Sequence, residues 1–88
     1  MDMTIDVIEY DNRRGLEFAW DNSFSIAVVQ RSHGVEIVAN RAGLISLARV
    51  LLTMAQDSID LPRPFDIELD ESNALEDDSL PLRLIRTD

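Results

Sequence analysis

The apolar residues of this chain change their spacing twice along the sequence, and this change limits the fold more than any other feature. Up to Ala39 they alternate with polar residues or form short β-branched runs, as strands do. Between Asn40 and Leu61 they recur every three or four residues, as on one face of a helix. From Phe65 onward they alternate again. Strands, one helix and further strands, in that order, predict an α+β fold.

Several segments carry the strand pattern, and clusters of turn residues separate most of them. Pro81 cannot donate a ladder hydrogen bond, so the last strand lies at an edge or opens at this residue. Its residues Leu80, Leu82 and Leu84 alternate and are expected to point inward. We therefore predict an antiparallel sheet of five to six strands, drawn from residues 3–10, 16–20, 24–30, 35–39, 65–70 and 80–85.

The helical segment carries a broad apolar stripe. A stripe of this width is typical of a helix that lies across a sheet, so we expect one helix packed on one face of the sheet. Asn40 is placed to cap the first turn, and Pro62 prevents the helix from continuing. The other sheet face would then be solvated or covered by a partner. The stripe consists of Leu44, Leu47, Ala48, Leu51, Met54 and Ala55, widened by Ile45 and Leu52.

The length and composition of the chain limit its class. Its 88 residues suffice for one small domain, which we take as residues 1–88. Cysteine is absent, so disulfides, thiolate catalysis and Cys-based zinc sites are excluded. The first residues lack the basic and apolar regions of a signal peptide, and no apolar stretch is long enough to span a membrane. These features predict a soluble cytoplasmic protein.

Acidic residues outnumber basic residues by 17 to 8, which gives a net charge of −9, and every basic residue is Arg. Negative charge of this size opposes binding to nucleic acids and to anionic membranes. It favours a basic protein partner, although it serves solubility equally well. A core this small also leaves little room for a catalytic cavity, which disfavours an enzyme.

The stretch from Asp66 to Asp78, DIELDESNALEDD, holds much of this acidity and no basic residue. An EF-hand calcium loop does not fit it. A loop starting at Asp66 lacks the required Gly and the final Glu, and one starting at Asp70 has Ala74 at a ligand position. We expect no dedicated metal site and no cofactor. The carboxylates of the stretch are Asp66, Glu68, Asp70, Glu71, Glu76, Asp77 and Asp78.

An acid–base pair is the second interpretation of this stretch. Asp66, Glu68 and Asp70 alternate on a predicted strand, with about 6–7 Å between neighbours. Carboxylates on an open sheet face stay solvated, however, so their pKa values are not driven apart. His33, the only histidine, lies in a turn by composition. We therefore expect no catalytic residues, which leaves a solvated edge or a protein-binding surface.

Residues after position 39 resemble a known family. The resemblance lies in Asn40-Arg-Ala-Gly-Leu-Ile-Ser-Leu-Ala-Arg, in Leu51-Leu52-Thr-Met-Ala-Gln56, in Ile67-Glu-Leu-Asp70 and in Leu75-Glu-Asp-Asp-Ser-Leu80. These segments resemble small bacterial immunity proteins of polymorphic toxin systems, of the immunity protein 32 type. The resemblance implies an intracellular, non-enzymatic protein that binds and neutralises a cognate toxin. It transfers no site residues, because the family pattern often has histidines where Asp66 and Glu68 stand.

We therefore predict an inhibitor whose seven carboxylates form a surface that docks on the basic active site or substrate groove of a toxin domain. Glu36 joins this surface if its strand lies nearby. The alternative is a structural or regulatory module without a toxin partner. Such a module would self-associate, because an uncovered sheet face or edge strand can pair with its own copy. A homodimer is compatible with both functions.

Overall fold

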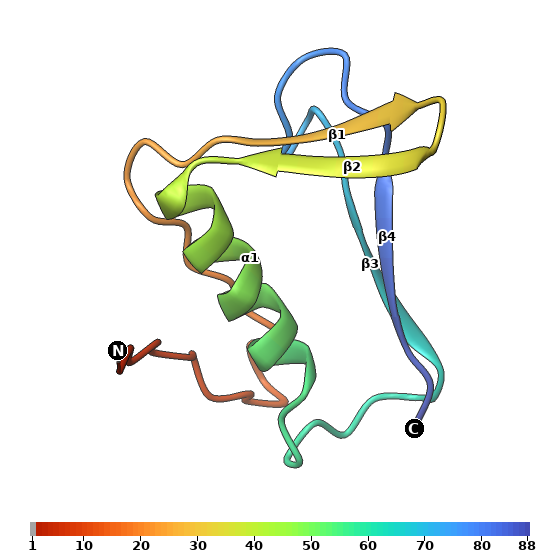
Figure 1. Ribbon diagram of the computed structural model, residues 1–88. Helices are drawn as coiled ribbons and strands as arrows, with labels where there is room; N and C mark the ends of the chain where they lie inside the picture. Colours follow the sequence, from red (N-terminus) through yellow and green to blue (C-terminus); the bar gives the residue numbers. More distant parts are fainter. Residues whose placement is uncertain (1) are drawn as a thin grey trace.

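The computed structural model describes residues 2–88 and shows an α+β fold (Figure 1). Two antiparallel pairs of strands flank a single helix among these residues. The first pair runs across one end of the molecule, and the helix and the second pair both descend from it (Figure 1). The elements in chain order are β1 (Ile26–Arg31), β2 (Gly34–Ala39), α1 (Arg41–Met54), β3 (Phe65–Leu69) and β4 (Leu82–Arg86).

The expected antiparallel sheet of five to six strands is wrong. β1 pairs only with β2 and β3 pairs only with β4, so the described chain contains two separate two-stranded sheets. The strands predicted from the alternation at residues 24–30, 35–39, 65–70 and 80–85 are confirmed within a few residues. Residues 3–10 and 16–20 form no strand.

The N-terminal segment is held by side chains rather than by a neighbouring strand. The side-chain amide of Gln56 accepts a hydrogen bond from the Tyr10 amide at 2.8 Å and donates one to the Ile8 carbonyl at 3.0 Å. Arg49 donates to the carbonyls of Asp6 and Ala19 at 2.9 and 3.2 Å. These side chains bond to backbone amides and carbonyls that a sheet would otherwise pair. The segment therefore runs along α1 without forming a strand ladder.

β1 has β2 on one side and a loop on the other. The amides of Glu76 and Leu80 donate to the carbonyls of Ile26 and Val28 at 2.8 and 2.9 Å. The Val28 amide donates to Oγ of Ser79 at 3.2 Å. The loop between β3 and β4 therefore covers the edge of β1 that β2 leaves open.

The core lies under β1, where the two sheets and the helix meet. Its buried cluster is Ile26, Val28, Leu69 and Leu75. Leu82 and Leu84 pack against this cluster, as their alternation predicts, and so do Trp20 and Phe24, whose rings stack at 4.9 Å. Leu80, also expected to point inward, lies before β4 and is 38% exposed.

Helix α1 starts as predicted. The side-chain oxygen of Asn40 accepts a hydrogen bond from the Gly43 amide at 2.7 Å, which caps the first turn. The helix has 14 residues and ends at Met54, well before the stop expected at Pro62. The described chain has no helix with the length and hydropathy that a membrane span requires.

The predicted face of α1 is wrong in part. Part of the stripe is covered, since Met54 is buried and Leu47 packs on the core. Leu44, Leu51 and Leu52, however, are 55%, 47% and 46% exposed. The N-terminal chain covers another side of the helix, where small and polar residues admit its backbone. The buried positions of α1 are Gly43, Ser46, Val50, Thr53 and Met54.

Candidate functional site

The acidic stretch divides into two strand residues, a turn and an exposed loop. Asp66 and Glu68 lie on the exposed side of β3 and face Arg83 of β4. The guanidinium of Arg83 lies 3.2 Å from the Asp66 carboxylate and 3.8 Å from that of Glu68. All three side chains are about half exposed, so this is a solvated cross-strand group. Its negative charge is partly neutralised by a residue from outside the stretch.

Asp70 and Glu71 shape the loop. The amide and hydroxyl of Ser72 both donate to Oδ1 of Asp70. These hydrogen bonds stabilise the charged form and lower the pKa of Asp70. The carbonyl of Asp70 accepts from the amides of Ala74 and Leu75, and Glu71 accepts from the amide of Asp78 at 2.6 Å. Both carboxylate side chains therefore serve hydrogen bonds within the loop.

Glu76, Asp77 and Asp78 are the uncommitted part of the stretch. All three are exposed. Within residues 2–88, no hydrogen bond or ion pair engages their carboxylates. Asp78 has a φ of 67°, a left-handed conformation that Asp tolerates better than most residues. These three residues are called the acidic tip.

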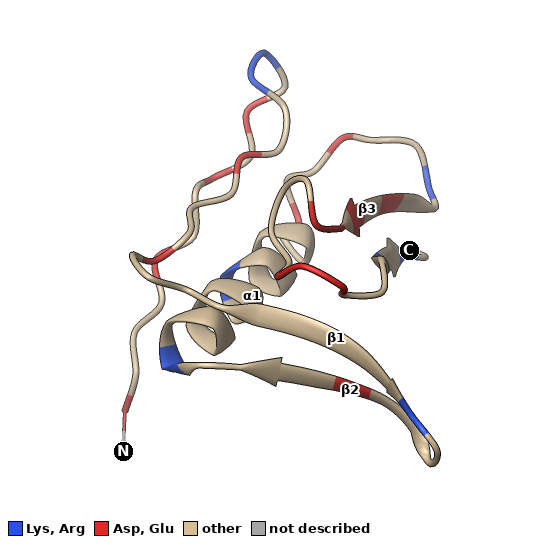
Figure 2. Cartoon of the chain, turned by 90° about the horizontal axis from the view of Figure 1, so that it is seen from above, with Lys and Arg blue, Asp and Glu red and all other residues tan. Residues whose placement is uncertain are grey.

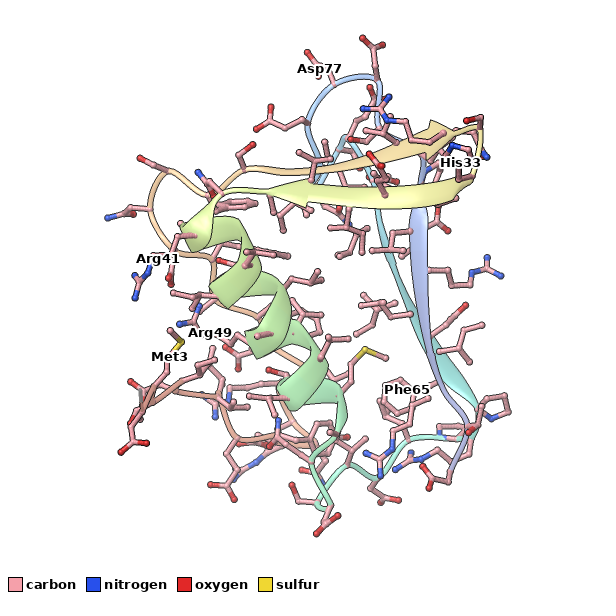
Figure 3. All side chains as sticks on the ribbon, in the orientation of Figure 1. Met3, His33, Arg41, Arg49, Phe65 and Asp77 are labelled. Carbon is pink, nitrogen blue, oxygen red and sulfur yellow. The ribbon has the colours of Figure 1, made fainter. Side chains whose placement is uncertain are left out.

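Figure 2 shows where these charges lie. The acidic loop is on the side of β1 that faces away from β2. Glu36, expected to join the acidic surface only if its strand lay nearby, lies on β2 across the hairpin and pairs with Arg31 at 3.0 Å. It therefore does not join the acidic loop. Figure 3 shows Asp77 at the outer end of the loop, directed away from the core.

The surroundings of the acidic stretch give it no enclosed site. Two open hollows, of 430 and 660 Å³, lie elsewhere, one lined by residues 9–14 and the other between the end of α1 and β4. None of the seven carboxylates lines either hollow. In the described part of the chain, no group of three His, Asp or Glu residues is arranged to hold a metal ion. His33 lies in the exposed turn between β1 and β2, as predicted.

A second surface was not predicted as a site. It combines the exposed apolar side chains of α1 with those of β2, which are each at least 45% exposed. In the sequence, this surface is indicated by a second stripe on the helix, formed by small and polar residues. Gly43, Ser46 and Thr53 recur at helical spacing and accept close backbone packing, which leaves the leucine side free. The second surface consists of Val35, Ile37 and Leu44 and is called the α1/β2 surface, whereas Val38 is exposed on the opposite face of β2 and Leu51 borders the hollow between α1 and β4.

Comparison with known proteins places most of this chain in one family. Residues 34–87, more than half of the chain, match the model of a family described as Immunity protein 32. The match covers β2, α1, β3, the acidic loop and β4. No curated protein and no solved structure shows significant similarity to the chain.

Proposed function

The chain belongs to the immunity protein 32 family, and we propose that it is a non-enzymatic inhibitor that binds and occludes a cognate bacterial toxin domain in the cytoplasm. Family membership supports a protein that acts on a toxin partner. The observation that carries the proposal is the acidic tip, Glu76, Asp77 and Asp78, whose carboxylates are exposed and engaged by no group of the described chain.

The loop is held in place before binding. At one end the Leu75 side chain is buried and the Glu76 amide bonds to β1, and at the other Leu80 bonds to β1. Glu71 closes the loop through the Asp78 amide. A loop fixed in this way loses little conformational entropy on docking, so more of the electrostatic attraction appears as affinity.

A basic active site or substrate groove is the surface that fits this loop. Three adjacent carboxylates would attract clustered Arg and Lys side chains and accelerate the encounter. Asp66 and Glu68 would contribute less because Arg83 neutralises part of their charge. Inhibition then follows from occlusion, since the bound loop excludes the substrate of the toxin. The same charge disfavours nucleic acids and anionic membranes as partners.

Capture of the partner is the first test. The tagged chain is used to isolate proteins from a lysate of its source organism at low and at high salt, and each captured protein is identified and assayed for toxicity. The expected partner is lost at high salt, and purified chain added at equal molarity abolishes its activity. If no captured protein has a toxic activity that the chain inhibits, the proposed function is wrong.

A charge-matched pair of variants then tests the site. Glu76→Gln, Asp77→Asn and Asp78→Asn together remove three charges from the acidic tip while keeping side-chain size. Three carboxylates in other exposed segments, changed as Glu9→Gln, Asp57→Asn and Asp60→Asn, give a control with the same net charge. At low salt, we expect the first variant to associate with the captured partner about tenfold more slowly and with a weaker salt dependence. Equal effects of both variants would show that only net charge matters and would exclude the acidic tip as the site.

A further inference from the structure

β2 has an open edge. Val28 directs its amide and carbonyl away from β2, to Ser79 and Leu80, and it lies opposite Ile37 in the hairpin. In an antiparallel ladder, two opposite residues either bond to each other through their amides and carbonyls, or both direct these groups away from each other. The amide and carbonyl of Ile37 therefore point outward. Figure 2 shows β2 as the outer strand of the hairpin, with no helix or strand of residues 2–88 beyond it.

This open edge is also apolar and lies next to the exposed side of α1. Ile37 and Val35 are on the same face of the hairpin as Ile26, which packs closely against Gly43 of α1. Leu44 is turned by about 100° from Gly43 and is exposed beside that face. A long, apolar and unprotected edge is a surface that another strand will pair with.

The charge around this edge differs from that of the whole chain. From Ile37 to Gln56 the sequence contains no carboxylate, and its charged residues are Arg41 and Arg49. Arg49 is paired with Asp21 at 2.9 Å. Glu36 of β2 is paired with Arg31 at 3.0 Å. The edge therefore carries little net charge, so it does not attract a basic partner, whereas a second copy presents an equally neutral edge.

We propose that β2 pairs antiparallel with β2 of a second copy, so that two hairpins form a continuous four-stranded sheet. A two-fold axis at Ile37 places Ile37 opposite its own equivalent and Val35 opposite the partner's Ala39. Glu36 then faces the partner's Val38, so no two like charges are opposed. A pairing centred on Glu36 would instead oppose two carboxylates at close distance, which is destabilising.

The pairing also brings apolar side chains of the two copies together. Val35, Ile37 and Leu44 are 58%, 45% and 55% exposed on the α1 side of the hairpin. The acidic loops stay on the two outer edges, about 24 Å apart at ordinary strand spacing. Because the Debye length is about 8 Å at physiological salt, their repulsion is largely screened.

Sedimentation equilibrium of the purified 88-residue chain tests the proposal across the micromolar to millimolar range. The expected result is a concentration-dependent species of twice the monomer mass of 10.0 kDa. Ile37→Pro removes one outward amide while leaving the hydrogen bonds between β1 and β2 intact, because Ile37 does not bond to Val28. Leu44→Lys places a charge on the α1/β2 surface. Leu80→Lys is the control, since Leu80 is an exposed leucine at the opposite edge of the hairpin.

We expect Ile37→Pro and Leu44→Lys each to weaken dimerisation by at least about tenfold, and Leu80→Lys to have little effect. Circular dichroism tests whether each variant is folded. If Ile37→Pro does not fold, the test of the dimer rests on Leu44→Lys. A wild-type chain that remains monomeric throughout, or a folded Leu44→Lys that dimerises like wild type, would overturn the proposal. A monomer would leave the surface to a partner of another kind. Toxin binding at the acidic tip is unaffected by either outcome, because that loop lies on the other edge of the hairpin.

Discussion

Gly43→Ala tests the contact between α1 and the chain that enters β1. A Cβ at this position would overlap the carbonyl oxygen of Ser25 and lie 2.9 Å from its carbon and 3.0 Å from Cγ1 of Ile26. Ordinary contacts of a Cβ start near 3.4 Å. The Ser25 atoms belong to the backbone and cannot rotate away, so the first turn of α1 would have to move.

That movement would disturb the hydrogen bonds of Asn40. Its side chain accepts from the amides of Gly43 and Ser25 at 2.7 and 3.0 Å and donates to the Ser23 carbonyl at 2.9 Å. Overpacking of this kind costs about 1–3 kcal/mol, and each lost hydrogen bond adds about 1 kcal/mol. The higher helix propensity of Ala returns about 1 kcal/mol. With two of the three hydrogen bonds lost, we expect a net loss of about 2–4 kcal/mol in the free energy of unfolding, a large share of the stability of a domain this small.

Urea unfolding monitored by Trp20 fluorescence and by circular dichroism measures this loss. Ala48→Gly in the same helix calibrates the propensity contribution and should cost about 1 kcal/mol. If Gly43→Ala is as stable as wild type, or gains the amount that propensity alone predicts, the packing argument is refuted.

Two further predictions concern the loop between β3 and β4. Ser79→Ala removes the acceptor of the buried Val28 amide and should lower the free energy of unfolding by about 1–2 kcal/mol, measured by urea unfolding, whereas an unchanged value would show that water replaces the hydroxyl. Asp70→Asn tests the pH dependence. Because folding lowers the pKa of Asp70, its contribution to stability is present above the ordinary value of 3.8 and is lost as the pH falls through the folded pKa. The variant should therefore be less stable than wild type near neutral pH, and the difference between their urea midpoints should disappear as the pH falls below the folded pKa of Asp70. A difference that stays constant with pH would contradict the stabilising role of the Asp70 carboxylate.

Features that depend on neighbouring residues could be predicted from the sequence. The Asn40 cap, the helix and the strand periodicity at residues 65–70 rest on contacts within a few positions, and the structure confirms them. The same holds for the turn at His33. These features follow from local sterics and hydrogen bonding, which the chain carries wherever it folds.

The pairing of strands and the exposed face of the helix were decided by tertiary contacts. Alternation shows that a segment can form a strand, but it does not supply the neighbour that the strand needs. Gln56 and Arg49 bind the backbone of the N-terminal segment, so that segment forms no sheet. Helix α1 carries two stripes, one of leucines and one of small residues. The side with the small residues is buried, where the Ser25 backbone packs closely against Gly43.

The acidic stretch shows the same division. Its carboxylates are evident in the sequence, and the family resemblance that accompanies them is confirmed by the match over residues 34–87. Which of them are free for a partner depends on groups brought in by folding. Arg83 of β4 reaches Asp66 and Glu68 on β3, while Glu71 accepts a hydrogen bond from the amide of a residue seven positions away. The sequence by itself therefore determines the charge and the local elements, whereas the tertiary structure determines which charges and which apolar side chains stay available, because availability depends on contacts between distant residues.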